Sequence, residues 1–186
     1  MVYLERGDIV VRELRESDIM PIVEGEIAQG WQGATREKYD MRLQHEAEGK
    51  CIPLCATYKG EPVGYVNLYL EAYPPMDRFH CPEIVDFGVL EKCRRNGIGS
   101  ALMDVAEGLA AERCDLVCLG VGLHYGYGSA QRMYVKRGYI PDGSGVWYND
   151  NVCPPYTDCE NDDGLILYLC KEFSNDKISG TDSTFA

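Results

Sequence analysis

Apolar residues in the first fifty positions occur first as a short β-branched run and then at helical spacing. Residues 9–14 form the β-branched run, which is typical of a strand. Ser17 follows as a suitable N-cap for a helix, with Pro21 still in the tolerant first turn. Residues 36–50 are rich in helix formers, with apolar side chains at four-residue spacing. The pattern therefore predicts a strand followed by two helices.

The middle of the chain contains three apolar runs that are too short for helices. Residues 52–58 and 63–70 are separated by a turn with Gly and Pro, which predicts an antiparallel hairpin. The third run, residues 84–90, contains Gly88. A glycine inside a strand marks a bulge or a close backbone approach, so we expect an irregular strand here.

The C-terminal half alternates helices and strands. Residues 97–114 carry apolar side chains every three or four positions, which indicates an amphipathic helix packed on a sheet. The other expected elements are a helix over 129–137 that Gly138 ends, strands over 116–121 and 164–170, and a Gly-, Pro- and Asp-rich stretch over 139–163 that begins as a strand. This order of elements predicts an α/β (α+β) fold, a mixed sheet flanked by helices.

Length and composition are typical of one compact domain. The chain has 186 residues, of which 45% are hydrophobic and 26% are charged, close to the average of globular proteins. We expect residues 1–173 to form a single domain. Residues 174–186 are polar, and we expect them to form a flexible tail.

The net charge narrows the classes of partner. With 30 acidic and 18 basic residues, the formal charge is −12, so the average field repels phosphate backbones and anionic membranes. We therefore expect neither nucleic acid nor a membrane as a partner. A basic leader before an apolar run and a stretch of bilayer length are both missing from the sequence, which predicts a cytoplasmic protein.

The nine cysteines predict reduced thiols rather than a disulfide framework. Their number is odd, no two have the Cys-x-x-Cys spacing, and several lie in apolar runs. The three histidines are far from one another in sequence. We therefore expect no metal site.

The segment with the clearest chemistry lies between an expected strand and an expected helix. Here Arg94, Gly97 and Gly99 are spaced Arg-x-x-Gly-x-Gly. The glycines let the backbone approach a ligand closely, and the free N–H groups of a helix N-terminus favour diphosphate oxygens. The segment is neither a P-loop, because no lysine follows Gly99, nor a dinucleotide fingerprint, because Leu102 replaces the third glycine.

A second motif follows some thirty residues later, with Ala130, Tyr134, Gly138 and Tyr139 on one helix and its end. Alone it is typical of core packing, but the two motifs together resemble the GNAT superfamily of acyl-CoA-dependent N-acyltransferases. The resemblance spans residues 8–172. It implies a mixed, mostly antiparallel sheet of about seven strands with about four helices, split between the fourth and fifth strands. It also implies acetyl transfer from acetyl-CoA to a primary amine.

The resemblance also implies which residues bind coenzyme A. The pyrophosphate would lie on Arg94, Arg95, Asn96, Gly97, Ile98, Gly99 and Ser100, and pantetheine would lie along Phe87, Gly88 and Val89. Tyr127 stands where the family commonly has Asn, so Ser129 is a candidate replacement for that contact.

For catalysis, the resemblance assigns Tyr134 as the general acid that protonates the leaving thiolate. Glu83 is the candidate general base, with Asp86 as an alternative on the opposite strand face. His124 is a further alternative base.

The acceptor side is expected to suit a cationic amine, from a small molecule or a peptide. Its candidate residues are Trp31, Asp86 and Tyr125, which the resemblance places on the acceptor side, and aromatic rings beside acids attract cations. A different class of function stays open, a non-catalytic acyl-CoA-binding regulatory module, which the replacement at Tyr127 favours. The final strands could also pair across a homodimer.

Overall fold

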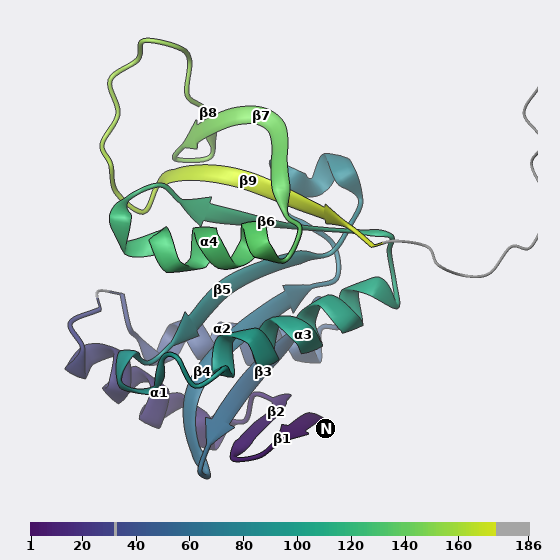
Figure 1. Cartoon of the computed structure of the whole chain (residues 1–186), viewed down its shortest axis with the longest axis vertical. Helices are drawn as coiled ribbons and strands as arrows, with labels where there is room; N and C mark the ends of the chain where they lie inside the picture. Colours follow the sequence, from purple (N-terminus) through teal and green to yellow (C-terminus); the bar gives the residue numbers. More distant parts are fainter. Residues whose placement is uncertain (32, 174–186) are drawn as a thin grey trace, which may run out of the picture.

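The computed structural model describes residues 1–31 and 33–173. Its centre is one nine-stranded sheet with the order β1-β2-β3-β4-β5-β6-β9-β7-β8 (Figure 1). The strands are β1 (Val2–Arg6), β2 (Ile9–Glu13), β3 (Cys51–Tyr58), β4 (Glu61–Tyr69), β5 (Glu83–Val89), β6 (Leu116–Gly122), β7 (Ile140–Tyr148), β8 (Asn151–Val152) and β9 (Leu165–Glu172).

The sheet divides between β5 and β6. These two strands form its parallel pair, and the paired residues are only Glu83 with Cys118 and Ile84 with Leu119. Every other neighbouring pair of strands is antiparallel. Beyond Ile84, β5 continues along β4 while β6 continues along β9, so the sheet opens into a V between them (Figure 1). This opening corresponds to the split that the resemblance predicts between the fourth and fifth strands. The strand numbers differ by one because β1 precedes the first expected strand.

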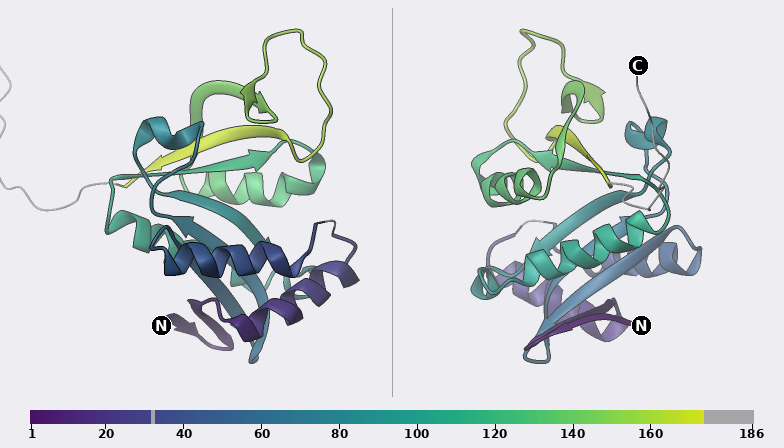
Figure 2. Two further views of the ribbon diagram at one scale, coloured as in Figure 1. Left: turned by 180° about the vertical axis from the view of Figure 1, so that it is seen from behind. Right: turned by 45° about the vertical axis from the view of Figure 1, so that its right-hand side comes forward.

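Helices cover both faces of the sheet. They are α1 (Glu16–Ala28), α2 (Arg36–Ala47), α3 (Ile98–Ala111) and α4 (Gly128–Lys136), with short turns η1 (Met76–Phe79), η2 (Glu91–Cys93) and η3 (Tyr125–Tyr127). The helices α1 and α2 pack on one face of the N-terminal half, and α3 packs on the other (Figure 2). The helix α4 lies beside β6 across the opening from α3 (Figure 1).

The main core lies between α3 and the sheet. Ile98, Leu102 and Met103 on α3 are fully buried against Leu54 and Val66 of the sheet. Burial of such a side chain contributes about 1.5–3 kcal/mol to folding. This packing fixes the position of the α3 N-terminus at the mouth of the V.

The differences from expectation include two strands and the start of the first helix. The structure has nine strands rather than about seven, because β1 and β8 are exposed edge strands without a recognisable apolar pattern. The expected N-cap at Ser17 is wrong. The helix α1 begins at Glu16, with Arg15 as its N-cap, and the Arg15 N–H donates to the carboxylate of Asp18 at 2.8 Å.

The expected irregularity in the strand before the glycine motif is present. Tyr65 pairs with Gly88 and Asn67 with Val85, so Asp86 and Phe87 together face one residue of β4. Asp86 has a φ of 54°. The bulge is therefore centred on Asp86 and Phe87, next to Gly88.

The expected tail, residues 174–186, lies outside the described residues. Among the residues that the structure does describe, no helix combines the length and apolarity needed to cross a membrane.

Candidate functional site

The N-terminus of α3 lies at the mouth of the opening between β5 and β6. Arg95 and Gly97 both have positive φ, 65° and 84°, so the chain turns sharply before the helix begins. The first helical bond is donated by the Ala101 N–H to the Gly97 carbonyl at 3.0 Å. The N–H groups of the three residues between them have no intrahelical acceptor. Together with the helix dipole, they form an anion-binding end.

A groove of about 450 Å³ runs from this helix end along β5 to α4. Every residue predicted to contact coenzyme A lines the groove except Asn96: Phe87, Gly88, Val89, Arg94, Arg95, Gly97, Ile98, Gly99, Ser100 and Ser129. The Asn96 amide instead donates to the carbonyls of Cys93 and Arg94, at 3.0 and 3.2 Å. Its side chain therefore holds the loop in shape.

Trp31 also lines this groove. The Arg94 guanidinium lies 5.6 Å from the centre of the Trp31 ring, a cation–π distance. The predicted acceptor residue Trp31 is thus placed beside the loop motif, and it is not among the residues of the second cavity described next.

A second cavity, of about 250 Å³, lies deeper in the V between β5 and β6. Three carboxylates line it, those of Glu83, Asp86 and Asp163, and its lining contains no Lys, Arg or His among the described residues. Phe87, Tyr127 and Ala130 belong to both cavities, so the groove and the second cavity adjoin at these residues. We call them the coenzyme groove and the acceptor cavity, after the ligands that the resemblance leads us to expect there.

Glu83 is the buried carboxylate of the acceptor cavity, with 7% of its surface exposed. Burial raises the pKa of Glu83 to about 7, and the N–H of Tyr73, which donates to it at 3.2 Å, opposes that rise. At neutral pH the group therefore exchanges a proton readily, as a general base must.

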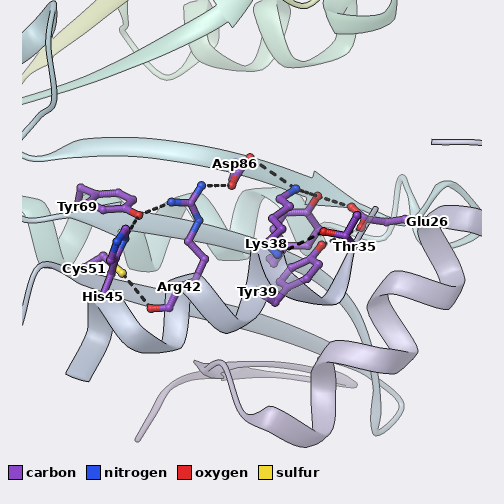
Figure 3. Close-up of polar contacts among 10 residues, drawn as sticks. Glu26, Thr35, Lys38, Tyr39, Arg42, His45, Cys51, Tyr69 and Asp86 are labelled. Atoms are coloured by element: carbon purple, nitrogen blue, oxygen red, sulfur yellow. Dashed lines mark hydrogen bonds and ion pairs between the residues drawn. The ribbon is translucent and has the colours of Figure 1, made fainter. Parts of the chain in front are cut away.

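Asp86 borders the acceptor cavity, but its carboxylate already has cationic partners (Figure 3). Arg42 donates to one oxygen, and the Lys38 ammonium lies 3.5 Å from the other. Both cations come from α2. Asp86, which the sequence predicts as an alternative base and as a substrate contact, is therefore already paired with two cations of the protein itself.

Tyr134 lines the acceptor cavity from α4 and is 5% exposed. Its ring packs near Phe87, with centroids 6.4 Å apart. Burial raises the pKa of Tyr134, which keeps the phenol protonated and able to donate at neutral pH.

Tyr127, His124 and Asp163 form a cluster at the rim of the acceptor cavity. Asp163 accepts a hydrogen bond from the Tyr127 hydroxyl at 2.8 Å and lies 3.0 Å from His124 Nε2. These two contacts lower the pKa of Asp163. His124 is thereby occupied at the rim, outside the cavity lining, and Tyr125 is 99% exposed and lines neither cavity.

Sequence reasoning missed the α2 residues Lys38 and Arg42, and Tyr168 in the acceptor cavity. The i,i+4 spacing of the two cations indicates a common helix face but not what that face contacts.

The nine cysteines are unpaired thiols. Across residues 1–31 and 33–173, no group of three or more His, Cys, Asp or Glu side chains is placed to hold a metal ion. The cytoplasmic location and the homodimer stay predictions.

Residues 19–139 match the model of the Acetyltransferase (GNAT) family. No curated protein matches the chain.

Several solved structures share the architecture. Ard1 from Thermoplasma volcanium is 21% identical, with 90% of this chain and 99% of that chain covered and a TM-score of 0.66. The PaiA N-acetyltransferase from Thermoplasma acidophilum, in complex with coenzyme A, is 15% identical, with 89% and 99% covered and a TM-score of 0.62. The ribosomal-protein-alanine N-acetyltransferase from Brucella melitensis is 17% identical, with 88% and 99% covered and a TM-score of 0.64. At these identities the likeness concerns the fold.

Proposed function

Because the chain belongs to the GNAT acetyltransferase family, we propose that it transfers an acetyl group from acetyl-CoA to a primary amine of a small cationic molecule or peptide. The transfer is a direct attack in a ternary complex. The observation that carries this proposal is the pair of adjoining cavities of different charge, one lined by Arg94 and Arg95 and the other by the carboxylates of Glu83 and Asp163, which no cation of the described lining faces. Two substrates of opposite charge fit such a pair.

The coenzyme groove has the donors that acetyl-CoA needs. The free N–H groups of the first turn of α3 and the guanidinium groups of Arg94 and Arg95 would bind the pyrophosphate. The edge of β5 beyond Ile84, which has no pairing to β6, would bind the pantetheine amides as an added strand does. Coenzyme A, which is bound to the PaiA N-acetyltransferase, has the anionic and amide groups that suit this groove.

In the proposed reaction, Glu83 accepts the proton that the acceptor ammonium must lose, directly or through water. The amine nitrogen then attacks the thioester carbonyl carbon, and a backbone N–H beside the Asp86 bulge stabilises the developing oxyanion. As the carbon–sulfur bond breaks, Tyr134 donates its phenolic proton to the departing sulfur, and the attacking nitrogen releases its second proton, which restores the phenol of Tyr134. The products are an acetylamide and coenzyme A with a free thiol.

The acceptor class follows from the lining of the acceptor cavity. Glu83 and Asp163 contribute carboxylates to this lining, and Tyr127 and Tyr168 contribute aromatic rings. Among the described residues, the lining contains no basic side chain. A cation gains both Coulombic and cation–π attraction in such surroundings. A polyamine, an aminoglycoside-like amine, or a protein N-terminus or lysine all have this chemistry.

A second function has one observation in its favour. Tyr127, which replaces the usual Asn, packs over Gly122 at the junction of the two cavities and bonds to Asp163. If this ring stays in place, the chain binds acyl-CoA without turnover and acts as a regulatory module.

One experiment separates these functions. Isothermal titration with acetyl-CoA measures coenzyme binding, and a thiol-reactive dye measures release of the coenzyme A thiol across a panel of polyamines, aminoglycosides and short peptides. Binding with acceptor-dependent thiol release is expected. Binding without release from any amine would favour the regulatory module, and absence of binding would overturn both functions.

A further inference from the structure

The bulge in β5 holds an unfavourable backbone conformation at its centre. Asp86 has a φ of 54°, in the left-handed region that only glycine adopts without cost. Asp tolerates this region better than most residues, but a strained residue persists only where its surroundings hold it.

Two cations from α2 bind the Asp86 carboxylate, one on each oxygen (Figure 3). Arg42 donates from Nη2 to Oδ2, and Lys38 Nζ lies 3.5 Å from Oδ1. The Arg42 side chain is 15% exposed, so its attraction to Asp86 is screened less than that of a surface pair. The carboxylate therefore ties the bulge to α2.

Arg42 is itself held on its other side. Its Nη1 donates to the Tyr69 hydroxyl, and that hydroxyl lies 2.7 Å from His45 Nδ1 (Figure 3). Because Tyr69 belongs to β4 and His45 to α2, the guanidinium bridges the strand beside the bulge and the bulge itself.

The same group of side chains reaches the far end of the bulge. Lys38 Nζ donates to the Tyr65 hydroxyl at 3.3 Å, and Tyr65 in turn donates to the buried Glu26. The Tyr65 ring lies against Gly88, where an added Cβ would stand 2.7 Å from the ring. Contacts from α2 thus set both ends of the segment from Asp86 to Gly88.

We propose that Arg42 is a positioning residue, which through its ion pair with Asp86 holds the β5 bulge in the shape that binds the acetyl-CoA thioester. This inference rests on the proposed acetyltransferase function. It assigns the Asp86 carboxylate to the scaffold of the site rather than to contact with the acceptor amine. In the described part of the chain, the cations that pair with the Asp86 carboxylate are Arg42 and Lys38. Lys38, with its Nζ at 3.5 Å, is the second support of the carboxylate.

The test is a double-mutant cycle read out as the acetyl-CoA dissociation constant and as KM and kcat. The variants are Arg42→Gln, Asp86→Gly and their combination. Glycine adopts the left-handed conformation without an ion pair, so Arg42 should matter only while Asp86 is present. Arg36→Gln is the matched control, because Arg36 is an exposed cation of the same helix that pairs with Glu16 and Asp40, away from the bulge.

We expect Arg42→Gln to weaken acetyl-CoA binding about tenfold in the wild-type background and less than about twofold in the Asp86→Gly background. Arg36→Gln should change binding less than about twofold. An equal loss from Arg42→Gln in both backgrounds would overturn the inference, because Arg42 would then act without Asp86. A rise in acceptor KM alone for Asp86→Gly would also overturn it, because Asp86 would then bind the acceptor.

Folding is checked by circular dichroism. If Arg42→Gln does not fold, Arg42→Lys completes the same cycle, because lysine keeps the charge but cannot bridge Tyr69 and Asp86 together. Wild-type protein that binds no acetyl-CoA would overturn the proposed function. Wild-type binding without coupling between Arg42 and Asp86 would overturn this inference alone.

Discussion

The coenzyme groove and the acceptor cavity adjoin, yet they are built in different ways. The groove takes most of its lining from one continuous stretch, residues 87–100, and its anion-binding groups are largely backbone N–H groups. The acceptor cavity is lined by side chains from β5, β6, η3, α4, β9 and the segment before β9. A local motif can specify the first kind of site, whereas the second exists only after the sheet has formed.

The two regions also divide the charge of the chain. Among the described residues, the groove lining contains Arg94 and Arg95 and no acidic residue, while the acceptor cavity lining contains three acidic residues and no basic one. The formal charge of −12 is therefore not spread evenly over the site. The following changes test whether each region acts as its charge and geometry indicate.

The largest effect is expected from Glu83→Gln, which removes the base of the acceptor cavity. We expect kcat to fall about 10³-fold, within the range that general-base catalysis contributes, with acetyl-CoA affinity unchanged. In the wild type, kcat should fall as pH drops below about 7, because the base must be unprotonated. Steady-state kinetics between about pH 5.5 and about pH 9 measure both effects.

The same substitution should stabilise the fold at alkaline pH. Because the folded-state pKa of Glu83, about 7, exceeds its ordinary value of 4.5, the folded protein binds more protons, and the free energy of unfolding falls as pH rises between these values. Removing the buried carboxylate should recover up to about 3 kcal/mol at about pH 8, which denaturant titration of both proteins measures.

The control for Glu83 is Glu107→Gln, a buried carboxylate outside both cavities that pairs with Arg137 and Lys171. It should destabilise the protein, because Lys171 loses this ion pair and Arg137 keeps only its pair with Asp104. The fall of kcat below about pH 7 should stay in place. If kcat of Glu83→Gln still falls below about pH 7, Glu83 is not the base.

Tyr134→Phe tests the acid at the junction of the two regions. We expect kcat to fall about 10²-fold, because the departing thiolate loses its proton donor, while the acetyl-CoA dissociation constant stays within about twofold. Tyr139→Phe is the matched control, since its ring packs 5.8 Å from that of Tyr134 and does not line the acceptor cavity. An unaltered kcat for Tyr134→Phe would remove the acid role.

Gly99→Ala tests the groove. An added Cβ would stand 2.9 Å from the Phe87 ring, so Phe87 must shift along the groove wall. We expect acetyl-CoA binding to weaken about fivefold to tenfold with little effect on acceptor KM. Gly108→Ala on the same helix, with nothing within 4 Å of the added Cβ, is the control and should leave binding unchanged. Equal binding by both variants would show that the Phe87 contact is not required.

The smallest effect is expected from Asp163→Asn at the exposed rim of the acceptor cavity. Loss of one screened carboxylate should raise the KM of a cationic acceptor about threefold and leave kcat unchanged. Asp158→Asn, an acid of the same loop outside the cavity lining, is the control. The acceptor for these KM measurements is an amine that releases thiol in the panel described above. With a neutral acceptor, the two variants should have the same KM.

Much of the coenzyme side follows from local rules. Arg94, Gly97 and Gly99 have a spacing that a sharp turn and a helix N-terminus require, so their placement needs no knowledge of distant residues. The structure confirms the turn, the helix and the alignment of these residues along one groove. Two further contacts could not be predicted from the spacing of the motif. The Asn96 amide donates to a carbonyl of its own loop, and the Phe87 ring packs where a Cβ on Gly99 would lie.

The sequence by itself determined the order of the four helices and of seven of the nine strands, and the glycine–arginine turn, because hydrophobic periodicity and backbone freedom are properties of neighbouring residues. The family followed from the resemblance of two motifs. Only the tertiary structure decided that Glu83 is buried with a raised pKa, that Asp86 is bound by Arg42 and Lys38, and that Trp31 faces the coenzyme groove. These properties depend on dehydration and on charges brought together from separate elements. No local pattern encodes them, since they arise from contacts between separate elements; Arg42 and Asp86, for example, are 44 residues apart in the chain.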